Sequence, residues 1–193
     1  MKAEIISIGT ELLVGSILNT NAQFLSRQLA ENAVDVYHQT TVGDNVGRLV
    51  EAFEQAATRA DLVITSGGLG PTADDVTIQA LSKFIQKPLR LHHPTYRHVI
   101  RLLKSHQYPM TTLIAKQCYV PRGSWIIKNY FGTAPGVLMN TYRQGKNIWI
   151  LVLPGPPREL TPMFTVQALP LLQRLIKFPK EHFLIRSVKI TGL

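Results

Sequence analysis

A glycine-rich segment at residues 65–75 (TSGGLGPTADD) most constrains the fold, because it joins an apolar run at 61–64 to a helical pattern at 76–86. A strand, a glycine loop and a helix in this order present free backbone N–H groups to an anion. The segment lacks the Gly-Lys-Ser/Thr of a P-loop and the register of Gly-x-Gly-x-x-Gly. We therefore expect phosphate to bind the amides of Gly67, Gly68 and Gly70, unless the segment is only a tight turn.

Two carboxylates, Asp74 and Asp75, follow these glycines. They would repel a bare phosphate, whereas a divalent cation such as Mg²⁺ binds carboxylate and phosphate oxygens together. The same stretch also fits a capping box, with Thr72 as the N-cap and Asp75 near the third helical position. The two roles are compatible, so the sequence predicts a metal site and leaves a purely structural role open.

Strand-like and helix-like segments alternate three times in the first half of the chain. Apolar runs at 5–8, 34–37 and 61–64 are each followed by a helical pattern. Thr20 and Gln23 are the expected capping partners of the first helix, and Asn45 is the expected N-cap of the second. This alternation predicts an α/β fold with a mostly parallel sheet that has helices on both faces.

The loops that follow these three strands are expected to share one rim, because ligands bind beyond the carboxyl ends of parallel strands. They occupy residues 9–13, 42–45 and 66–75. Each loop carries at least one carboxylate, from Glu11, Asp44, Asp74 and Asp75. Each carboxylate alone could be a turn or cap residue, but their expected convergence in a basic chain favours a metal-assisted anion site.

The second half of the chain is less regular. The pattern predicts a helix at 95–107, a loop at 108–112, short strands at 116–120 and 125–128, and a hairpin of 137–139 with 148–153. A turn at 154–160 with prolines before a helix is a second candidate anion site. Pro170 predicts a kink or an end in that helix. Residues 177–193 are expected to be a linker and the start of a truncated following element, after a domain at 1–176.

The composition of the chain indicates which kinds of molecule it can bind. The net charge of +9 favours small anionic ligands, and nucleic acid is disfavoured because the basic residues are scattered without interleaved aromatics. The histidines at 92, 93, 98 and 106 lack zinc-site spacing and are expected on a solvated face. No apolar run reaches transmembrane length. The single cysteine, Cys118, excludes an intrachain disulfide, which fits the reducing compartment of a cytoplasmic protein, and it is expected to be buried and inert.

Six motifs in order resemble the N-terminal domain of the competence/damage-inducible protein A (CinA) family over about residues 1–176. They are 8–13 (IGTELL), 19–22 (NTNA), 42–44 (VGD), 67–72 (GGLGPT) with Asp74 and Asp75, 132–136 (GTAPG), and 153–157 (LPGPP) with Glu159. The resemblance implies the three-layer α/β/α molybdopterin-binding fold of molybdenum-cofactor biosynthesis proteins. It also implies a hydrolase of the ADP-ribose pyrophosphatase type that uses a divalent metal and forms AMP and ribose 5-phosphate.

The residues combine into one expected site. Asp44, Asp75 and Lys116 would be catalytic, and Asp44, Asp74 and Asp75 would hold the metal. The expected contacts to a nucleotide or pterin ligand are Gly9, Thr10, Glu11, Asn21, Gly67, Gly68, Gly70, Thr72, Gly132, Thr133, Gly155 and Pro156. We also expect a homo-oligomer, a dimer or trimer. The alternatives are a binding module for molybdopterin or a nucleotide without turnover, and a domain that mainly oligomerises.

Overall fold

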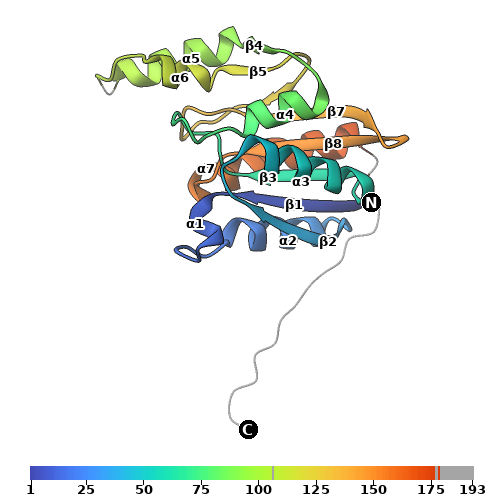
Figure 1. The fold of residues 1–193 in the computed structure, drawn as a ribbon. Coiled ribbons are helices and arrows are strands. Elements are labelled where there is room, and N and C mark those ends of the chain that lie inside the picture. Colours follow the sequence, from blue (N-terminus) through green and yellow to red (C-terminus); the bar gives the residue numbers. More distant parts are fainter. Residues whose placement is uncertain (106, 177, 179–193) are drawn as a thin grey trace.

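A six-stranded sheet forms the middle of the protein in the computed structural model, which describes residues 1–105, 107–176 and 178 (Figure 1). The strand order is β2-β1-β3-β8-β7-β6. The β1 strand pairs in parallel with β2 and β3, and β3 pairs in parallel with β8, whereas β7 is antiparallel to both β8 and β6. The expected mostly parallel sheet with a hairpin is therefore confirmed. The strands are β1 (Lys2–Ile8), β2 (Asp35–Val42), β3 (Leu62–Ser66), β6 (Trp125–Ile127), β7 (Gly136–Arg143) and β8 (Lys146–Leu153).

Helices cover both faces of this sheet, which confirms the three-layer architecture. The side chains of a strand alternate between its two faces, so Ile6 packs on one side with α3 (Val46–Arg59) and α4 (Thr77–Ile85). Its neighbour Ile5 packs on the other side. The helices there are α2 (Thr20–Glu31), α7 (Pro157–Pro162), the π-helical segment η1 (Met163–Ala168) and α8 (Leu169–Leu175).

A small lobe extends from one edge of the three layers (Figure 1). It contains β4 (Leu89–Leu91), α5 (His93–Ser105), α6 (Thr112–Lys116) and β5 (Tyr119–Pro121), with β4 and β5 antiparallel. Its own core includes Cys118, which is buried as expected, and burial raises the pKa of the thiol to about 11. The thiol therefore stays protonated near neutral pH. The expected strand at 116–120 is wrong at its start, because Lys116 ends a helix.

The starts of α2 and α3 and the end of β2 differ in how well they match the sequence predictions. Asn19, not Thr20, caps α2, because its side-chain oxygen precedes the first helical residue and accepts from the N–H of Ala22 at 3.1 Å. The β2 strand continues to Val42, because it pairs with β1 along its whole length. Asn45 does cap α3, as expected, and accepts from the N–H of Arg48 at 3.1 Å.

The capping box predicted at Thr72 is also wrong. Helix α4 begins five residues later, at Thr77, and its N-cap residue Val76 makes no side-chain cap. Thr72 and Asp75 instead close a turn of their own within the loop. Because no helix begins at Thr72, the Asp75 carboxylate does not cap a helix. It stabilises the loop instead, through its hydrogen bonds from Thr72.

The helix that ends the domain is interrupted just before Pro170. Six π-helical residues, η1, precede α8, and Pro170 is the second residue of α8, so the change of helix type lies beside the predicted kink or end. The predicted linker at 177–180 and the strand-like stretch at 182–191 lie outside the described residues, apart from Phe178. Among the helices of the described part, none is long and apolar enough to cross a membrane.

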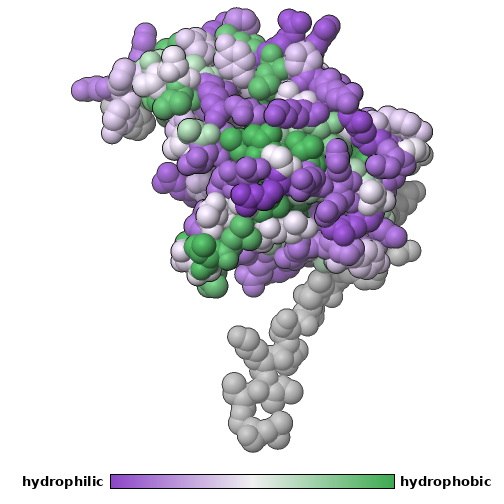
Figure 2. Space-filling model, in the orientation of Figure 1, coloured by the Kyte–Doolittle hydropathy of each residue, from purple (hydrophilic) through white to green (hydrophobic). Residues whose placement is uncertain are grey.

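Exposed apolar side chains gather at the end of α1 (Thr10–Leu13) and in the loop after it (Figure 2). They belong to Leu13, Val14, Ile17 and Leu18, the last with 86% of its surface exposed. Contiguous exposed apolar patches are common at interaction surfaces. The expected dimer or trimer stays a prediction.

Candidate functional site

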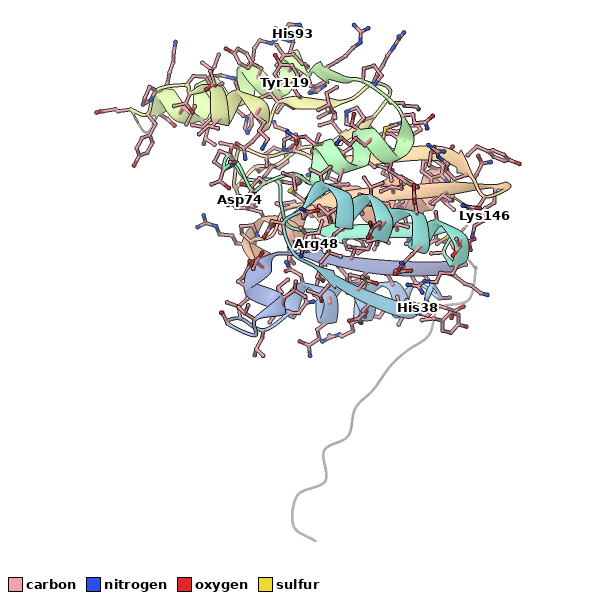
Figure 3. All side chains as sticks on the ribbon, in the orientation of Figure 1. His38, Arg48, Asp74, His93, Tyr119 and Lys146 are labelled. Carbon is pink, nitrogen blue, oxygen red and sulfur yellow. The ribbon has the colours of Figure 1, made fainter. Side chains whose placement is uncertain are left out.

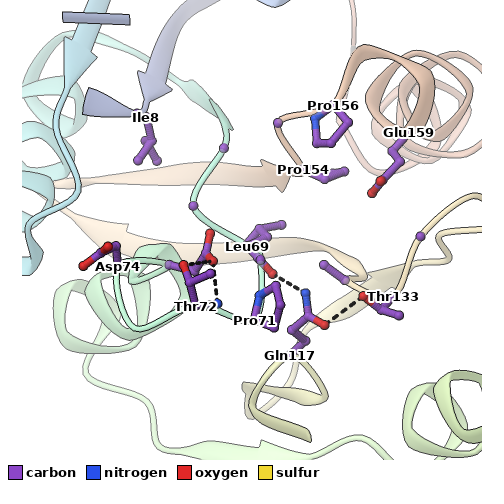
Figure 4. A pocket seen from close by; sticks show the side chains of 18 of the residues that line it. Ile8, Leu69, Pro71, Thr72, Asp74, Gln117, Thr133, Pro154, Pro156 and Glu159 are labelled. Atoms are coloured by element: carbon purple, nitrogen blue, oxygen red, sulfur yellow. Dashed lines mark hydrogen bonds between the residues drawn. The ribbon is translucent and has the colours of Figure 1, made fainter. Parts of the chain in front are cut away.

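A cleft of about 600 Å³ lies beyond the carboxyl ends of β1, β3 and β8 (Figure 4). Ile8 ends β1, Gly67 follows β3 and Pro154 follows β8, and all three residues line the cleft. Parallel strands place their carboxyl ends at one edge of a sheet, which explains why loops distant in sequence meet here. The shared rim expected from the sequence is therefore present.

Most of the residues expected to form the site line this cleft. They are Gly9, Glu11, Asp44, Gly67, Gly68, Gly70, Thr72, Asp74, Asp75, Gly132, Thr133, Gly155 and Pro156. Thr10, Asn21 and Lys116 are not among the lining residues. Each of these three forms hydrogen bonds with residues that line the cleft.

Asp44 and Asp75 are fixed by threonines in the same way. Both the backbone N–H and the hydroxyl of Thr10 donate to Asp44 Oδ2, each at 2.9 Å. The N–H and the hydroxyl of Thr72 donate to Asp75 Oδ2 at 2.9 and 2.7 Å. Within the described residues, the other oxygen of each carboxylate, Oδ1, accepts no hydrogen bond. Each aspartate is therefore oriented and still has an oxygen to offer to a ligand.

Glycines lie directly against the carboxylates of the cleft. A Cβ atom at Gly70 would overlap the carboxylate of Asp75, and one at Gly132 would overlap that of Glu159. In the loop itself, Gly67 and Gly68 have φ angles of +110° and +64°, which residues with a Cβ rarely adopt. The glycines thus give the loop its shape and leave room for the acidic side chains.

Some backbone N–H groups of the glycine loop already donate a hydrogen bond within the protein, and others do not. Gly67 donates its N–H to the carbonyl of Leu153 at 3.0 Å. This corrects the expectation that its amide binds phosphate. In the part of the chain that the structure describes, no hydrogen bond uses the N–H of Gly68, Leu69 or Gly70. These three amides in a row therefore remain able to donate to an anion.

Lys116 and Gln117, at the end of α6, hold the glycine loop in place. Lys116 Nζ donates to the carbonyl oxygens of Thr72 and Asp75 at 3.1 and 2.7 Å. Gln117 donates to the carbonyl of Leu69 at 2.8 Å and accepts from the hydroxyl of Thr133 at 2.8 Å (Figure 4). Lys116 therefore positions the glycine loop in this structure, and its expected catalytic role stays a prediction.

Asn21 connects the end of β3 with the turn that follows β8. Its Nδ2 donates to Ser66 Oγ at 2.7 Å and to the carbonyl of Gly155 at 2.6 Å. An amide at the start of α2 can reach both turns, because α2 packs beside α7 on that face of the sheet. Asn21 thus sets the position of the Gly155 turn and does not contact the cleft.

Nine further residues line the cleft but were not in the expected site: Ile8, Leu69, Pro71, Gln117, Phe131, Ala134, Pro154, Arg158 and Glu159. Glu159 is 9% exposed and accepts from Asn129 Nδ2 at 2.7 Å. In Figure 4 it lies across the cleft from Asp74. Arg158 directly follows the proline turn at 154–157, and that turn was the available signal. Phe131 directly precedes the motif at 132–136, which was a comparable signal, whereas Gln117 had none, because tertiary contacts bring it here.

The expected metal set does not form a cluster. Among the described residues, no three His, Cys, Asp or Glu side chains lie together in a way that could hold a metal ion. Asp44, Asp74 and Asp75 therefore do not make a complete protein site. Mg²⁺ is commonly bound by one or two carboxylates together with substrate phosphates. The available Oδ1 atoms of Asp44 and Asp75 fit that second arrangement.

The sequence of this chain is similar to those of known proteins. Residues 4–174 match the family described as a probable molybdopterin binding domain. A CinA-like protein from Kosmotoga olearia is 49% identical over 175 residues, which are 91% of this chain and 42% of that protein. This chain spans less than half the length of the curated relatives that it matches first.

Solved structures give the same assignment. The protein CinA from Thermoplasma acidophilum, described as of unknown function, superposes with a TM-score of 0.76 at 31% identity, covering 88% of this chain and 96% of that one. The molybdopterin biosynthesis enzyme MoaB from Thermus thermophilus shares the fold, with a TM-score of 0.59 at 22% identity over 90% of this chain and 92% of that one. With both its sequence motifs and its fold matched over nearly the whole domain, this chain belongs to the CinA family and carries the molybdopterin-binding-type domain of that family.

Proposed function

We propose that this domain hydrolyses a nucleotide pyrophosphate, with ADP-ribose cleaved to AMP and ribose 5-phosphate. One observation carries the proposal: a single cleft combines the amides of residues 68–70, which have no partner among the described residues, with two aspartates that are oriented by threonines. Amides of this kind bind phosphate oxygens. Oriented carboxylates bind the divalent cation that accompanies a pyrophosphate.

The proposal gives each group a role. The amides of the glycine loop and the exposed guanidinium of Arg158 bind the phosphates. Asp44 and Asp75 hold Mg²⁺ or a similar ion, which when bound neutralises charge that develops on the phosphate oxygens. Glu159, fixed through Asn129, is the candidate base for the attacking water. Lys116 and Gln117 keep the loop in register with the rest of the cleft.

A binding module without turnover is the second candidate, and a specific observation favours it. The carboxylates of the described residues do not form a complete metal site, and the matched family is described by binding alone. A cleft that holds molybdopterin or a nucleotide would need the same amides. It would not need Asp44 and Asp75 to act on the pyrophosphate.

The decisive experiment is release of AMP from ADP-ribose by the purified chain, with Mg²⁺ and with EDTA. Metal-dependent AMP release supports hydrolysis. If ADP-ribose raises the melting temperature but no AMP forms with Mg²⁺, Mn²⁺ or Co²⁺, the domain is a binding module. If ADP-ribose neither binds nor reacts, the proposal is wrong.

A further inference from the structure

A second pocket, of about 300 Å³, lies between α5 and the segment that follows β6. We call it the outer pocket. Positively charged and ionisable groups line it, from His92, His98 and Arg101 on one side and Lys128 on the other. Ile126 and Pro135 contribute apolar lining. None of the described residues that line it is Asp or Glu.

The absence of acidic residues extends far beyond the pocket. Residues 76–158 contain twelve Lys and Arg side chains and no Asp or Glu. The basic residues are therefore not simply scattered, as the sequence analysis expected: this segment has no carboxylates to balance them. Among the ion pairs of the described residues, only Lys146–Asp61 involves this segment, whereas Arg27–Glu31 and Arg59–Glu4 lie elsewhere. An excess of positive charge of this kind attracts anions.

Some ionisable side chains of α5 and its start line the outer pocket, and others are exposed to solvent. His93 lies at the outer edge of the lobe and is exposed (Figure 3). His92 and His98 are half-buried and line the pocket. The expectation of a solvated histidine face therefore holds for His93 only, among the three histidines of this group that are described. The pocket is a built cavity and not merely a basic surface.

We propose that the outer pocket binds a phosphate monoester. Arg101 offers a planar set of N–H donors that matches two phosphate oxygens, and Lys128 adds a compact charge. The apolar lining from Ile126 and Pro135 then contacts the carbon part of the ligand. A pocket of about 300 Å³ is larger than a phosphate ion needs, so a small phosphorylated molecule fits better.

The outer pocket is separate from the cleft but shares a wall with it. Thr133 lines both cavities. Asn129 connects them: its carbonyl lies 3.1 Å from His98 Nε2, and its Nδ2 donates to Glu159 in the cleft. The proposal does not depend on turnover in the cleft. Its test must nevertheless distinguish the two cavities, because phosphate could enter either.

The experiment follows the His98 ring signals by NMR while inorganic phosphate, and then ribose 5-phosphate, is added at constant ionic strength. The wild-type signals should shift in a saturable way, and ribose 5-phosphate should bind more tightly. Arg101→Gln and Lys128→Met should each weaken binding about tenfold, the size of one charge-assisted hydrogen bond. Both side chains are exposed, so both variants should fold.

The matched control is Lys104→Gln, which removes one exposed charge from the same helix without touching the pocket. It should keep the wild-type affinity. An equal loss of phosphate affinity in all three variants would mean that only the overall positive charge of the lobe attracts phosphate. Saturation with His98 unmoved would place the phosphate in the cleft. Either result overturns the proposal.

Discussion

Thr10 donates two hydrogen bonds to a single oxygen of Asp44, one from its backbone N–H and one from its hydroxyl, each at 2.9 Å. Thr72 and Asp75 repeat this arrangement in the glycine loop. The two aspartates line the same cleft. A carboxylate held by two donors keeps one orientation without a bound ligand, which lowers the cost of ordering it when a ligand arrives.

Asp75→Asn should abolish most turnover of ADP-ribose while leaving the fold intact. The amide oxygen can still accept from Thr72, so the loop should keep its shape. The variant loses the negative charge that would hold a divalent cation. We expect a fall in kcat of about 100-fold, the size of one strong electrostatic contribution. Steady-state assays of AMP release with Mg²⁺ measure it.

The matched control for this variant is Glu54→Gln, which neutralises an exposed carboxylate on α3 away from the cleft. Its kcat should equal that of wild type. Full activity in Asp75→Asn would restrict Asp75 to closing the turn with Thr72. The metal would then depend on Asp44.

Gly70→Ala should reduce activity through a single added carbon. Its backbone is not in the left-handed region, so alanine is allowed there, but the new Cβ would overlap the Asp75 carboxylate. We expect Asp75 to move and kcat to fall at least about tenfold, since small misplacements are costly in catalysis. Gly47→Ala in α3 is the control. Unchanged kinetics of Gly70→Ala would show that Asp75 can shift without consequence.

Mg²⁺ and ADP-ribose should stabilise the folded protein together more than separately. A ligand that binds only the folded state raises Tm by mass action. If the cation is held by Asp44, Asp75 and the phosphates jointly, each ligand increases the affinity for the other. Differential scanning fluorimetry with each ligand alone and with both tests this. Additive shifts in Tm would contradict a shared site.

Glu4 should make the domain sensitive to acid. This carboxylate is 1% exposed and lies 2.8 Å from two guanidinium nitrogens of Arg59. Burial alone would raise its pKa, but hydrogen bonds from Arg59 and Thr40 outweigh burial and lower the pKa below its ordinary value of 4.5. A group with a lowered pKa stabilises the folded state above its unfolded pKa, and that contribution is lost as the pH falls through the folded pKa.

The test is Glu4→Gln, unfolded by guanidinium chloride at pH 7 and pH 3. At pH 7 the variant should lose about 1.5–3 kcal/mol of unfolding free energy, the range for a hydrogen bond to a charged group. At pH 3 the difference from wild type should shrink. The control, Glu31→Gln, removes an exposed i,i+4 pair with Arg27 and should change little at either pH. If the variant lost the same free energy of unfolding at pH 7 and pH 3, the charge of Glu4 would not be the cause of the loss.

The sequence by itself determined the layered fold and the rim on which the cleft forms. Apolar runs and helical patterns are local properties, and the alternation of strands and helices restricts the topology to a parallel sheet with helices on both faces. That topology places the loops of Gly9, Asp44 and Gly67 at one edge. The convergence of the acidic residues of these loops therefore follows from the order of the strands and helices along the chain.

Only the tertiary structure decided how the individual groups are used. The N–H of Gly67 donates to the carbonyl of Leu153, and the ammonium group of Lys116 donates to the carbonyl of Asp75. In both pairs, packing brings together segments that are distant in sequence. The approach of Asn129 to Glu159 likewise depends on how the segment after β6 meets α7. Hydrogen bonds act over about 3 Å, so such pairings depend on packing details that no local pattern records.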